Sequence, residues 1–354
     1  MVPLPAEEER SMIFDAEVAY NELQLHFRDR VRRHEALARH CALGVGGPAD
    51  VWVVLESRRE LIGLVSLCAE EHWPALIVGN GTNILYADAG VRGIVARVAL
   101  NEYQIENQGD GTALLRAEAG VSWPLLLHNL APLGWGGLEF GVGIPGTLGG
   151  GVFSNAGAHN RDLGQVLEWI EVLDARGSNL EADDQISYPL VQRYHRDELD
   201  LSYRQSRFRQ RSQTRFDARG QLIPPTRSLI EPAEIVMQVE IRVHQEDPQR
   251  LRAVLAEYKR QRRLTEPPPH RVGTIFKDPP GNDAGRLIEQ AGLKGRTHGQ
   301  AHISTAHANY IVNSGEARAS DVAALIREAR QRMLEQFGVE LELDVELRGE
   351  WEVR

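Results

Sequence analysis

The sequence predicts an α+β protein, in which strands dominate the earlier part of the chain and helices the later part. Short runs rich in β-branched or alternating apolar residues indicate strands at 51–55, 75–78, 93–98, 113–119, 169–173 and 235–243. After Asp247, apolar residues recur with helical spacing, as in the stripe Leu251, Val254, Leu255 and Tyr258. Between the strands, Gly134–Gly157 carries ten of the chain's 33 glycines, which marks a specialised segment.

The composition is that of an ordinary folded protein. A length of 354 residues, with 42% hydrophobic and 25% charged residues, suits two or three domains. The formal net charge of −10 disfavours binding to nucleic acid or to an anionic membrane. An anionic ligand would therefore have to be held by local positive charge or by backbone N–H groups.

Cysteine content and apolar patterning point to a cytoplasmic protein. Cys41 and Cys68 are too few for a disulfide framework, and we expect both to be reduced. Residues 1–14 are acidic, lack the pattern of a signal peptide and are expected to form a tail. No apolar run approaches the ~20 residues of a membrane span.

The first elements are expected to form a small mixed domain. Over 16–30, alternation at Leu23, Leu25 and Phe27 favours a short strand, although a charged helix fits the same residues. A glycine turn at 44–47 leads into strand 51–55, and Ser57 can cap a helix over 59–70. Strands 75–78 and 93–98 follow, the second after a turn at 88–90.

The motif GNGTNIL, residues 79–85, follows the predicted strand 75–78 directly. Ligand phosphate is often held at a glycine-bearing turn after an apolar strand, although a tight structural turn has the same composition. A Rossmann dinucleotide site would need a third glycine and a following helix, and this segment has neither. Any dinucleotide here is therefore expected to bind in another way.

The glycine-rich segment Gly134–Gly157 is expected to be a buried cradle for a ligand. Flexible linkers are rich in serine and other polar residues. This segment instead interleaves the apolar residues Leu138, Phe140, Val142, Ile144, Leu148, Val152 and Phe153. A backbone without side chains can lie directly against a large ligand and direct its N–H groups at phosphate.

The rest of the chain contains further strands and then two long helices. A hairpin turn is expected at 174–177, and the basic, then Pro-rich residues 209–232 predict an exposed excursion. The first helix ends at residues 266–269, and we interpret its basic face as solvated rather than nucleic-acid binding: Arg260, Arg262 and Arg263. The second covers 320–337, capped by Ser320 and stopped by Gly338.

A metal site is not expected. His298, His302 and His307 match the spacing of no common metal site and have no cysteine or carboxylate in register. Nor does any Ser-His-Asp arrangement follow from the spacing.

Six motifs, taken together, resemble one enzyme family. They are GNGTNIL at 79–85, GIPGTLGGGVFSNAG at 143–157, YRQSRF at 203–208, GTIFKDP at 273–279, HANYIVN at 307–313 and LELDVELRG at 341–349. In this order they resemble the UDP-N-acetylenolpyruvoylglucosamine reductases, flavoenzymes that make UDP-N-acetylmuramate for peptidoglycan. The resemblance extends from about Arg39 to Gly349, and the stretch between Phe208 and Gly273 is similar to the shorter type II form.

The resemblance implies a two-lobed FAD-binding region of the PCMH type, followed by a smaller α+β substrate-binding domain. We expect lobe 1 at 15–100, lobe 2 at 101–232 and the C-terminal domain at 233–354. FAD would lie between the lobes, with its diphosphate against 79–83 and 143–150. The implied FAD-binding residues are Gly46, Gly79, Asn80, Gly81, Thr82, Asn83, Gly143, Ile144, Pro145, Gly146, Thr147, Gly149, Gly150, Asn155, Ala156 and Gly157.

The implied reaction is the NADPH-dependent reduction of UDP-N-acetylglucosamine enolpyruvate through FAD. An enolate-like intermediate needs a cation at the substrate carboxylate and a proton donor at the adjacent carbon. By position in the motifs, Arg204 would hold the carboxylate and Thr274 would donate the proton. Asp344 takes the position of the family's catalytic glutamate, and Glu342 is a possible substitute.

Three of these positions differ from the family pattern, with Thr274 for Ser, Asp344 for Glu and Asp278 for Asn. Gly151, Ser154 and His159-Asn160 also differ from the usual Ala, Met and Tyr-Gly. We expect retained activity, with a catalytically impaired flavin- or UDP-sugar-binding homologue and another PCMH-type flavin oxidoreductase as alternatives. The implied substrate-binding residues are Tyr203, Lys277, Asp278, Gln290, His307 and Asn309.

Overall fold

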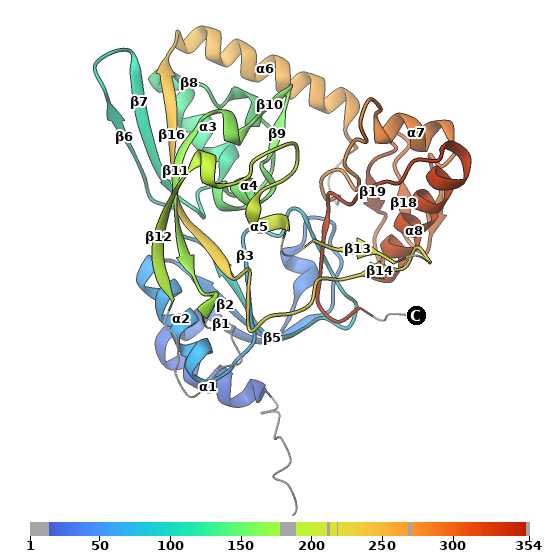
Figure 1. The fold of residues 1–354 in the computed structure, drawn as a ribbon, viewed down its shortest axis with the longest axis horizontal. Helices are drawn as coiled ribbons and strands as arrows, with labels where there is room; N and C mark the ends of the chain where they lie inside the picture. The colour runs from blue at the N-terminus through green and yellow to red at the C-terminus, as the bar shows by residue number, and fades with distance from the viewer. Residues whose placement is uncertain (1–13, 178–188, 211–212, 218, 268–270, 352–354) are drawn as a thin grey trace, which may run out of the picture.

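The computed structural model describes residues 14–177, 189–210, 213–217, 219–267 and 271–351. The predicted tail therefore lies almost wholly outside the described residues. Two large sheets and a C-terminal domain of helices and short strands lie around one central region (Figure 1). Among the described residues, no helix combines the length and apolar character needed to cross a bilayer.

Lobe 1 is a five-stranded sheet in the order β1–β2–β5–β3–β15. The strands are Val31–Ala36 (β1), Pro48–Leu55 (β2), Ala75–Val78 (β3), Val91–Val98 (β5) and Ile230–Glu231 (β15). Helix α2 (Arg58–Glu70) covers one face, and Ser57 caps it by accepting a hydrogen bond from the Glu60 N–H. The strands and the helix expected in this lobe after residue 50 are thus confirmed.

Residues Ala16–Phe27 form helix α1, so the strand favoured for this segment is wrong. Asp15 caps the helix by accepting from the N–H groups of Glu17 and Val18. Leu23 and Phe27 are buried four residues apart on one helical face, whereas Leu25 is 75% exposed. The spacing of four residues between Leu23 and Phe27 indicates a helix, whereas the alternation wrongly favours a strand.

Lobe 2 is a six-stranded antiparallel sheet in the order β12–β11–β16–β7–β6, with β8 also paired to β16. The strands are Tyr103–Asn107 (β6), Thr112–Glu118 (β7), Trp135–Gly136 (β8), Leu167–Asp174 (β11), Leu190–His195 (β12) and Glu234–Gln245 (β16). Helices α3 (Trp123–Leu130) and α4 (Leu148–Ser154) pack their apolar residues against the sheet. The strands expected at 113–119, 169–173 and 235–243 are confirmed.

Two further expectations fail in this lobe. Strand β16 pairs with β11 and β7, so the domain boundary expected near residue 233 comes too early. Helix α6 (Pro248–Thr265) also contacts lobe 2, and the C-terminal domain begins after it. No tight hairpin forms at 174–177, because Asp174 is still paired with Leu190.

The C-terminal domain packs a small sheet and helix α7 (Ala284–Gln290) against the long helix α8 (Ala319–Phe337). The sheet consists of Thr297–His298 (β17), Ala301–Ile303 (β18) and Ile311–Asn313 (β19). Arg318, rather than Ser320, is the N-cap of α8, and Gly338 ends the helix as expected. The last strand, Glu346–Arg348 (β20), pairs with Ile84–Tyr86 (β4) and so joins this domain to lobe 1.

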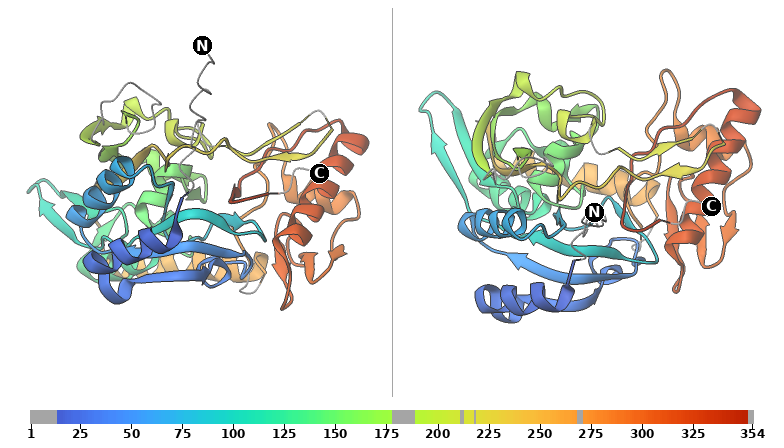
Figure 2. Two further views of the ribbon diagram at one scale, coloured as in Figure 1. Left: turned by 90° about the horizontal axis from the view of Figure 1, so that it is seen from below. Right: turned by 60° about the horizontal axis from the view of Figure 1, so that its bottom comes forward.

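The Pro-rich residues do not form an exposed excursion. After α5 (Arg207–Gln210), strands Arg215–Phe216 (β13) and Leu222–Ile223 (β14) form a hairpin beside α8 (Figures 1 and 2). Leu222 is buried with the α8 core residues, and Arg330 Cζ lies 4.3 Å from the Phe216 ring centroid. The chain then returns to lobe 1 as β15, so we call residues 213–217 and 219–232 the strap.

Buried residues form two apolar clusters, one on each face of the lobe 1 sheet. Val53 and Leu55 of β2 belong to the cluster shared with lobe 2. Trp52, whose side chain points to the opposite face, belongs to the cluster shared with the C-terminal domain. Lobe 1 is therefore packed between the other two units, and the functional site lies where all three meet.

Candidate active site

A cavity of about 570 Å³ lies at the junction of the two lobes and the C-terminal domain. Its walls come from the segment after β3, from the glycine-rich segment with α4, and from the loops around Thr274 and Asp344. The end of α6 closes one side with Arg262 and Glu266.

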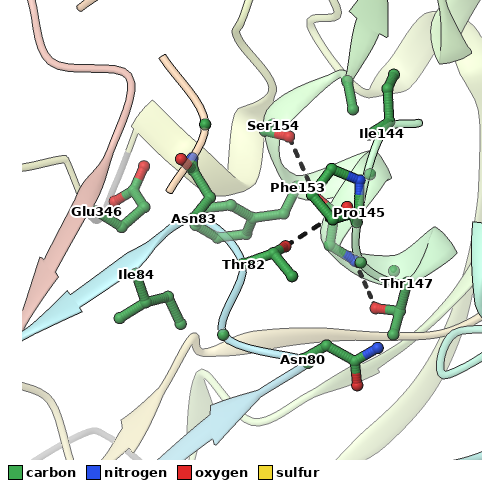
Figure 3. Close-up of a pocket in the computed structure, with 18 of the residues that line it drawn as sticks. Asn80, Thr82, Asn83, Ile84, Ile144, Pro145, Thr147, Phe153, Ser154 and Glu346 are labelled. Carbon is green, nitrogen blue, oxygen red and sulfur yellow. Dashed lines mark hydrogen bonds between the residues drawn. The ribbon is translucent and has the colours of Figure 1, made fainter. Parts of the chain in front are cut away.

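The two glycine-bearing loops predicted to bind a ligand face each other in this cavity (Figure 3). Thr82 Oγ1 donates a hydrogen bond to the Pro145 carbonyl at 3.5 Å. A Cβ atom at Gly79 would lie 2.9 Å from Thr147 Oγ1, and one at Gly146 would lie 2.8 Å from Thr82 Oγ1. Glycine at these two positions therefore allows the loops to approach each other closely.

The backbone of these loops offers hydrogen-bond donors to a ligand. Within the described residues, no group accepts from the N–H groups of Asn80, Gly81 and Thr82, or from those of Gly146 and Thr147. Thr147 also caps α4, whose first turn lines the cavity. Free N–H groups at a turn and a helix start suit a diphosphate, and the apolar lining from Ile144 and Phe153 suits a ring system.

Most of the predicted FAD-binding residues line the cavity: Gly79, Asn80, Gly81, Thr82, Asn83, Ile144, Pro145, Gly146, Thr147, Gly149, Gly150, Ala156 and Gly157. The structure places three others outside its lining. Gly46 packs against Tyr86, and Gly143 leaves room for the Arg262 side chain. Asn155 ends α4 in a left-handed conformation, and its amide donates to the Ser202 carbonyl at 2.8 Å.

The three predicted catalytic residues meet at another part of the cavity. Thr274 Oγ1 donates to Asp344 Oδ2 at 2.8 Å, and Arg204 Nε lies 3.4 Å from the same oxygen. Arg204 Nε is buried and, among the described residues, has no partner with hydrogen-bond geometry. Arg204 has φ +53°, a left-handed conformation that costs a non-glycine residue about 1–3 kcal/mol.

Asp344 is a buried carboxylate held in its ionised form. Burial by itself would raise the pKa of Asp344. The charges of Arg204 and Arg209, with hydrogen bonds from Arg209 and Thr274, outweigh burial and lower the pKa below its ordinary value. Glu342 instead has a side chain that is 70% exposed and pairs with Lys277, so Asp344 is the carboxylate that reaches the cavity.

Two of the predicted substrate-binding residues, Asp278 and His307, line the cavity. Asp278 Oδ1 accepts from the Ala284 N–H at 2.9 Å and thereby fixes the start of α7. The Tyr203 hydroxyl donates to Asp278 Oδ2 at 3.2 Å, so Tyr203 lies beside the cavity and is 57% exposed.

The structure does not bring the other three predicted substrate-binding residues into the lining. Lys277 is buried, and its Nζ lies 3.2 Å from Glu342 Oε2. Asn309 is also buried and bonds both backbone groups of Phe276, which is a structural role. Gln290 is exposed at the end of α7.

In the sequence, His159 stands out only as a departure from the family pattern, and no cavity residue is expected at the end of α6. The His159 ring stacks on Tyr258 with centroids 3.7 Å apart, and burial and Arg262 lower the pKa of His159. Arg262 pairs with Glu266 at 2.8 Å and lines the cavity, so its assignment to a solvated face is wrong. Glu346 and Arg348 also line the cavity; both lie in the motif at 341–349, but the resemblance assigned neither of them a role.

The fold and site define a flavoprotein with a two-lobed FAD-binding region and a C-terminal domain that completes the cavity. Residues 49–183 match the family model described as FAD binding domain. Residues 265–348 match the model described as UDP-N-acetylenolpyruvoylglucosamine reductase, C-terminal domain. This second match begins where α6 ends, in agreement with the boundary that the sheets indicate.

Whole-chain relatives agree with these matches. The UDP-N-acetylenolpyruvoylglucosamine reductase of Rubrobacter xylanophilus is 38% identical over 317 residues, which cover 89% of this chain and 94% of that protein. That of Chloroflexus aggregans is 36% identical over 315 residues, covering 89% and 96%. The crystal structure of UDP-N-acetylenolpyruvylglucosamine reductase from Thermus caldophilus matches with a TM-score of 0.67 and 33% identity, covering 90% of this chain and 98% of that one.

This chain belongs to the UDP-N-acetylenolpyruvoylglucosamine reductase family and is an FAD-dependent oxidoreductase. The resemblance, the fold class and the cofactors expected from the sequence are thus confirmed.

Proposed function

We propose that this chain reduces UDP-N-acetylglucosamine enolpyruvate to UDP-N-acetylmuramate, with NADPH as hydride donor, in the cytoplasmic synthesis of peptidoglycan precursors. One observation carries this proposal. Arg204, Thr274 and Asp344 converge in the same cavity as a backbone cradle suited to the FAD diphosphate. A cradle and a proton-handling cluster in one cavity are what a flavin-dependent reduction needs.

The chain's first task is to hold the cofactor. Bound FAD would supply the hydride relay between NADPH and the substrate double bond. The free N–H groups of residues 80–82 and 146–147 would hold the diphosphate, and the Arg262 side chain lies beside Gly143 at the start of the second loop. This accounts for a dianionic group bound by a protein whose net charge is −10.

Arg204 binds the enolpyruvyl carboxylate of the substrate. A guanidinium is planar and always charged, and it can bond both oxygens of a carboxylate at once. Negative charge builds up on this group as the double bond accepts hydride, so Arg204 stabilises the transition state more than the ground state. Its strained backbone and its long contact with Asp344 are consistent with a side chain reserved for a ligand.

Thr274 donates the proton to the carbon beside the carboxylate. The hydroxyl is anchored by Asp344 Oδ2, and this bond fixes the position of the oxygen in the cavity. Asp344 is ionised, so it orients the hydroxyl and balances the nearby guanidinium charges rather than serving as the acid. Solvent returns the proton to Thr274 after turnover.

Two of the three substituted positions, Thr274 and Asp344, retain their chemistry, which supports turnover rather than binding alone. Thr274 keeps a hydroxyl, Asp344 keeps a carboxylate, and the two groups are in hydrogen-bond contact. The shorter aspartate side chain therefore still reaches its partners.

The test mixes the purified, yellow protein with NADPH and UDP-N-acetylglucosamine enolpyruvate and follows the nicotinamide absorbance band. We expect NADPH oxidation that depends on the enolpyruvyl substrate, with UDP-N-acetylmuramate as the product. Protein that carries FAD but shows no substrate-dependent oxidation would refute the proposal and favour a binding-only homologue.

A further inference from the structure

One buried arginine has no part in the reaction described so far. Arg209 follows the YRQSRF motif on α5, and its side chain is 0% exposed. Burying a guanidinium this completely is unfavourable unless its charge and its donors are all matched. Its partners lie at the catalytic part of the cavity, which makes Arg209 a candidate for a role beyond packing.

The contacts of Arg209 connect two of the proposed catalytic residues. Nη1 donates to Asp344 Oδ1 at 2.9 Å and to the Arg204 carbonyl at 2.8 Å. Nε donates to Glu346 Oε1 at 2.7 Å, and Nη2 bonds the main-chain carbonyl of Asp344. One side chain thus holds both the Asp344 carboxylate and the left-handed backbone of Arg204.

These contacts divide the two oxygens of Asp344 between different partners. Arg209 takes Oδ1 and Thr274 takes Oδ2, which leaves Arg204 with only its 3.4 Å approach to Oδ2. Arginine and carboxylate strongly prefer a two-point pair when both oxygens are free. Without Arg209, Arg204 could therefore form such a pair with Asp344 and turn away from a ligand.

We infer that Arg209 is a positioning residue, which keeps the Arg204 guanidinium available to the substrate carboxylate by occupying Asp344 Oδ1 and the Arg204 carbonyl. This inference rests on the proposed function of the same site.

The charge of Arg209 also affects the ionisation of Asp344. The charged and titratable groups near it, besides the hydroxyl of Thr274, are Tyr203, Arg204, Arg209, Glu346 and, through Glu346, Arg348. Arg209 is one of the two cations that lower the pKa of Asp344. Its removal raises this pKa, so any activity that needs the ionised carboxylate loses its acidic range.

The kinetic test compares Arg209→Met with Arg209→Lys in the FAD-loaded protein. For Arg209→Met we expect the KM for the enolpyruvyl substrate to rise at least about tenfold, as for one lost charge-assisted contact. The acidic limb of kcat/KM should move to higher pH, while the KM for NADPH should change less than about twofold. Lysine keeps the charge but cannot contact the same groups at once. Arg209→Lys should therefore have the acidic limb of the wild type, and a substrate KM between that of the wild type and that of Arg209→Met.

Arg30→Met is the matched control. Arg30 makes a two-point pair with Glu60 at 2.8 and 2.6 Å in lobe 1, away from the cavity. The Arg30→Met variant should have a lower melting temperature, but the acidic limb of its kcat/KM profile and its substrate KM should be unchanged. If Arg209→Met changes only the melting temperature, as this control does, the inference is wrong. If Arg209→Met does not fold, a substrate KM for Arg209→Lys equal to that of the wild type overturns the inference equally.

A second readout needs no turnover. Thermal unfolding of Arg209→Met, Asp344→Asn and the double variant forms a double-mutant cycle. We expect non-additive losses at pH 7 that become additive as the pH falls and Asp344 is protonated. Additive losses at every pH would overturn the inference even in an active enzyme. Non-additive losses in a protein without activity would instead support the contact and refute the proposed function.

Discussion

Glu342 and Asp344 are two residues apart, yet their side chains are in different environments. The Glu342 side chain is 70% exposed and pairs with Lys277, whereas Asp344 is buried beside Thr274 and Arg209. The backbone of Leu343 bridges Phe276, so the chain here follows the GTIFKDP segment closely. Only a carboxylate that faces the cavity can contact a ligand there, and of these two it is Asp344 that does so.

Asp344→Asn should therefore abolish turnover, because it removes the charge that anchors Thr274 and balances the two arginines. Flavin should stay bound, because the cradle lies on other segments. The measurement is substrate-dependent NADPH oxidation together with the flavin absorbance of the purified variant. Glu342→Gln is the control and should retain nearly full activity. The opposite pattern would mean that the motif had been aligned two residues out of register.

Thr274→Ser should match or exceed the rate of the unchanged protein. Serine keeps the hydroxyl that donates to Asp344 and removes a methyl group that restricts the side-chain rotamer. Thr274→Val, which keeps the shape without the hydroxyl, should lower kcat by about 10²–10⁴-fold, the usual range for a lost acid. Steady-state kcat of the two variants checks this, and a large loss in Thr274→Ser would show that the methyl group packs productively.

Lowering the pH should reduce the stability of the folded protein, in part because Asp344 becomes protonated. Its pKa is lowered in the folded state, so its stabilising contribution is present above the unfolded-state pKa and is lost as the pH falls through the folded-state value. The melting temperatures of the unchanged protein and of Asp344→Asn should therefore differ most near neutral pH and converge in acid. Calorimetry across this range makes the comparison, and a constant difference would contradict it.

At the scale of elements, the cofactor cradle depends on close approaches of backbone. A Cβ at Gly81 would lie 1.9 Å from the His40 carbonyl oxygen, and Gly81 has φ +62°. The loop 79–83 is thus fixed against the segment before β2 and cannot accept a side chain there. Glycine at position 81 therefore fixes where the proposed phosphate cradle lies.

Gly81→Ala should destabilise the protein by at least about 1–3 kcal/mol and should reduce bound FAD, because the loop must move. Gly63→Ala is the matched control, since Gly63 lies in α2 with open space around it. That change should stabilise the protein by about 0.5–1 kcal/mol. Thermal unfolding and the flavin-to-protein absorbance ratio measure both effects, and normal flavin content in Gly81→Ala would contradict this account of the loop.

At the scale of the whole molecule, segments distant in sequence connect the three units around the cavity. The strap leaves lobe 2, packs against α8 and ends as a strand of lobe 1. Strand β20 similarly joins the C-terminal domain to β4. Asp344 lies two residues before this strand, so the proposed catalytic carboxylate is held close to the pairing between domains.

Leu222→Ala should destabilise the chain by about 2–5 kcal/mol, because Leu222 is 6% exposed in the core shared with α8. Ile223→Ala, at the neighbouring residue of β14, is the control and should cost little, because Ile223 is 43% exposed. Denaturant unfolding of both variants gives the comparison. Equal losses would show that the strap does not support the C-terminal domain.

Much of the site could be predicted because its parts are local. The cradle is visible as glycines that follow a strand, and Arg204, Thr274 and Asp344 each lie in a recognisable motif. Arg209 and Arg262 escaped prediction because nothing in their local sequence differs from that of ordinary surface charges, and Glu346 lies in the motif at 341–349 without a role implied for it. Contacts that form only in the folded chain decide their surroundings, since Arg209 pairs with Glu346, 137 positions away, and Arg262 lies beside Gly143.

The amino-acid sequence by itself determined the α+β class and most of the strands, and it predicted the glycine-rich loops and the motif residues that line the cavity. Periodicity, glycine placement and motif order are properties of neighbouring residues, so they can be read without a structure. The tertiary structure alone decided that β16 belongs to lobe 2, that the strap supports α8, and that Asp344 rather than Glu342 faces the cavity. These features depend on pairing and burial between segments up to 261 positions apart, as in the Asn83–Asp344 bond, and local sequence does not encode such contacts.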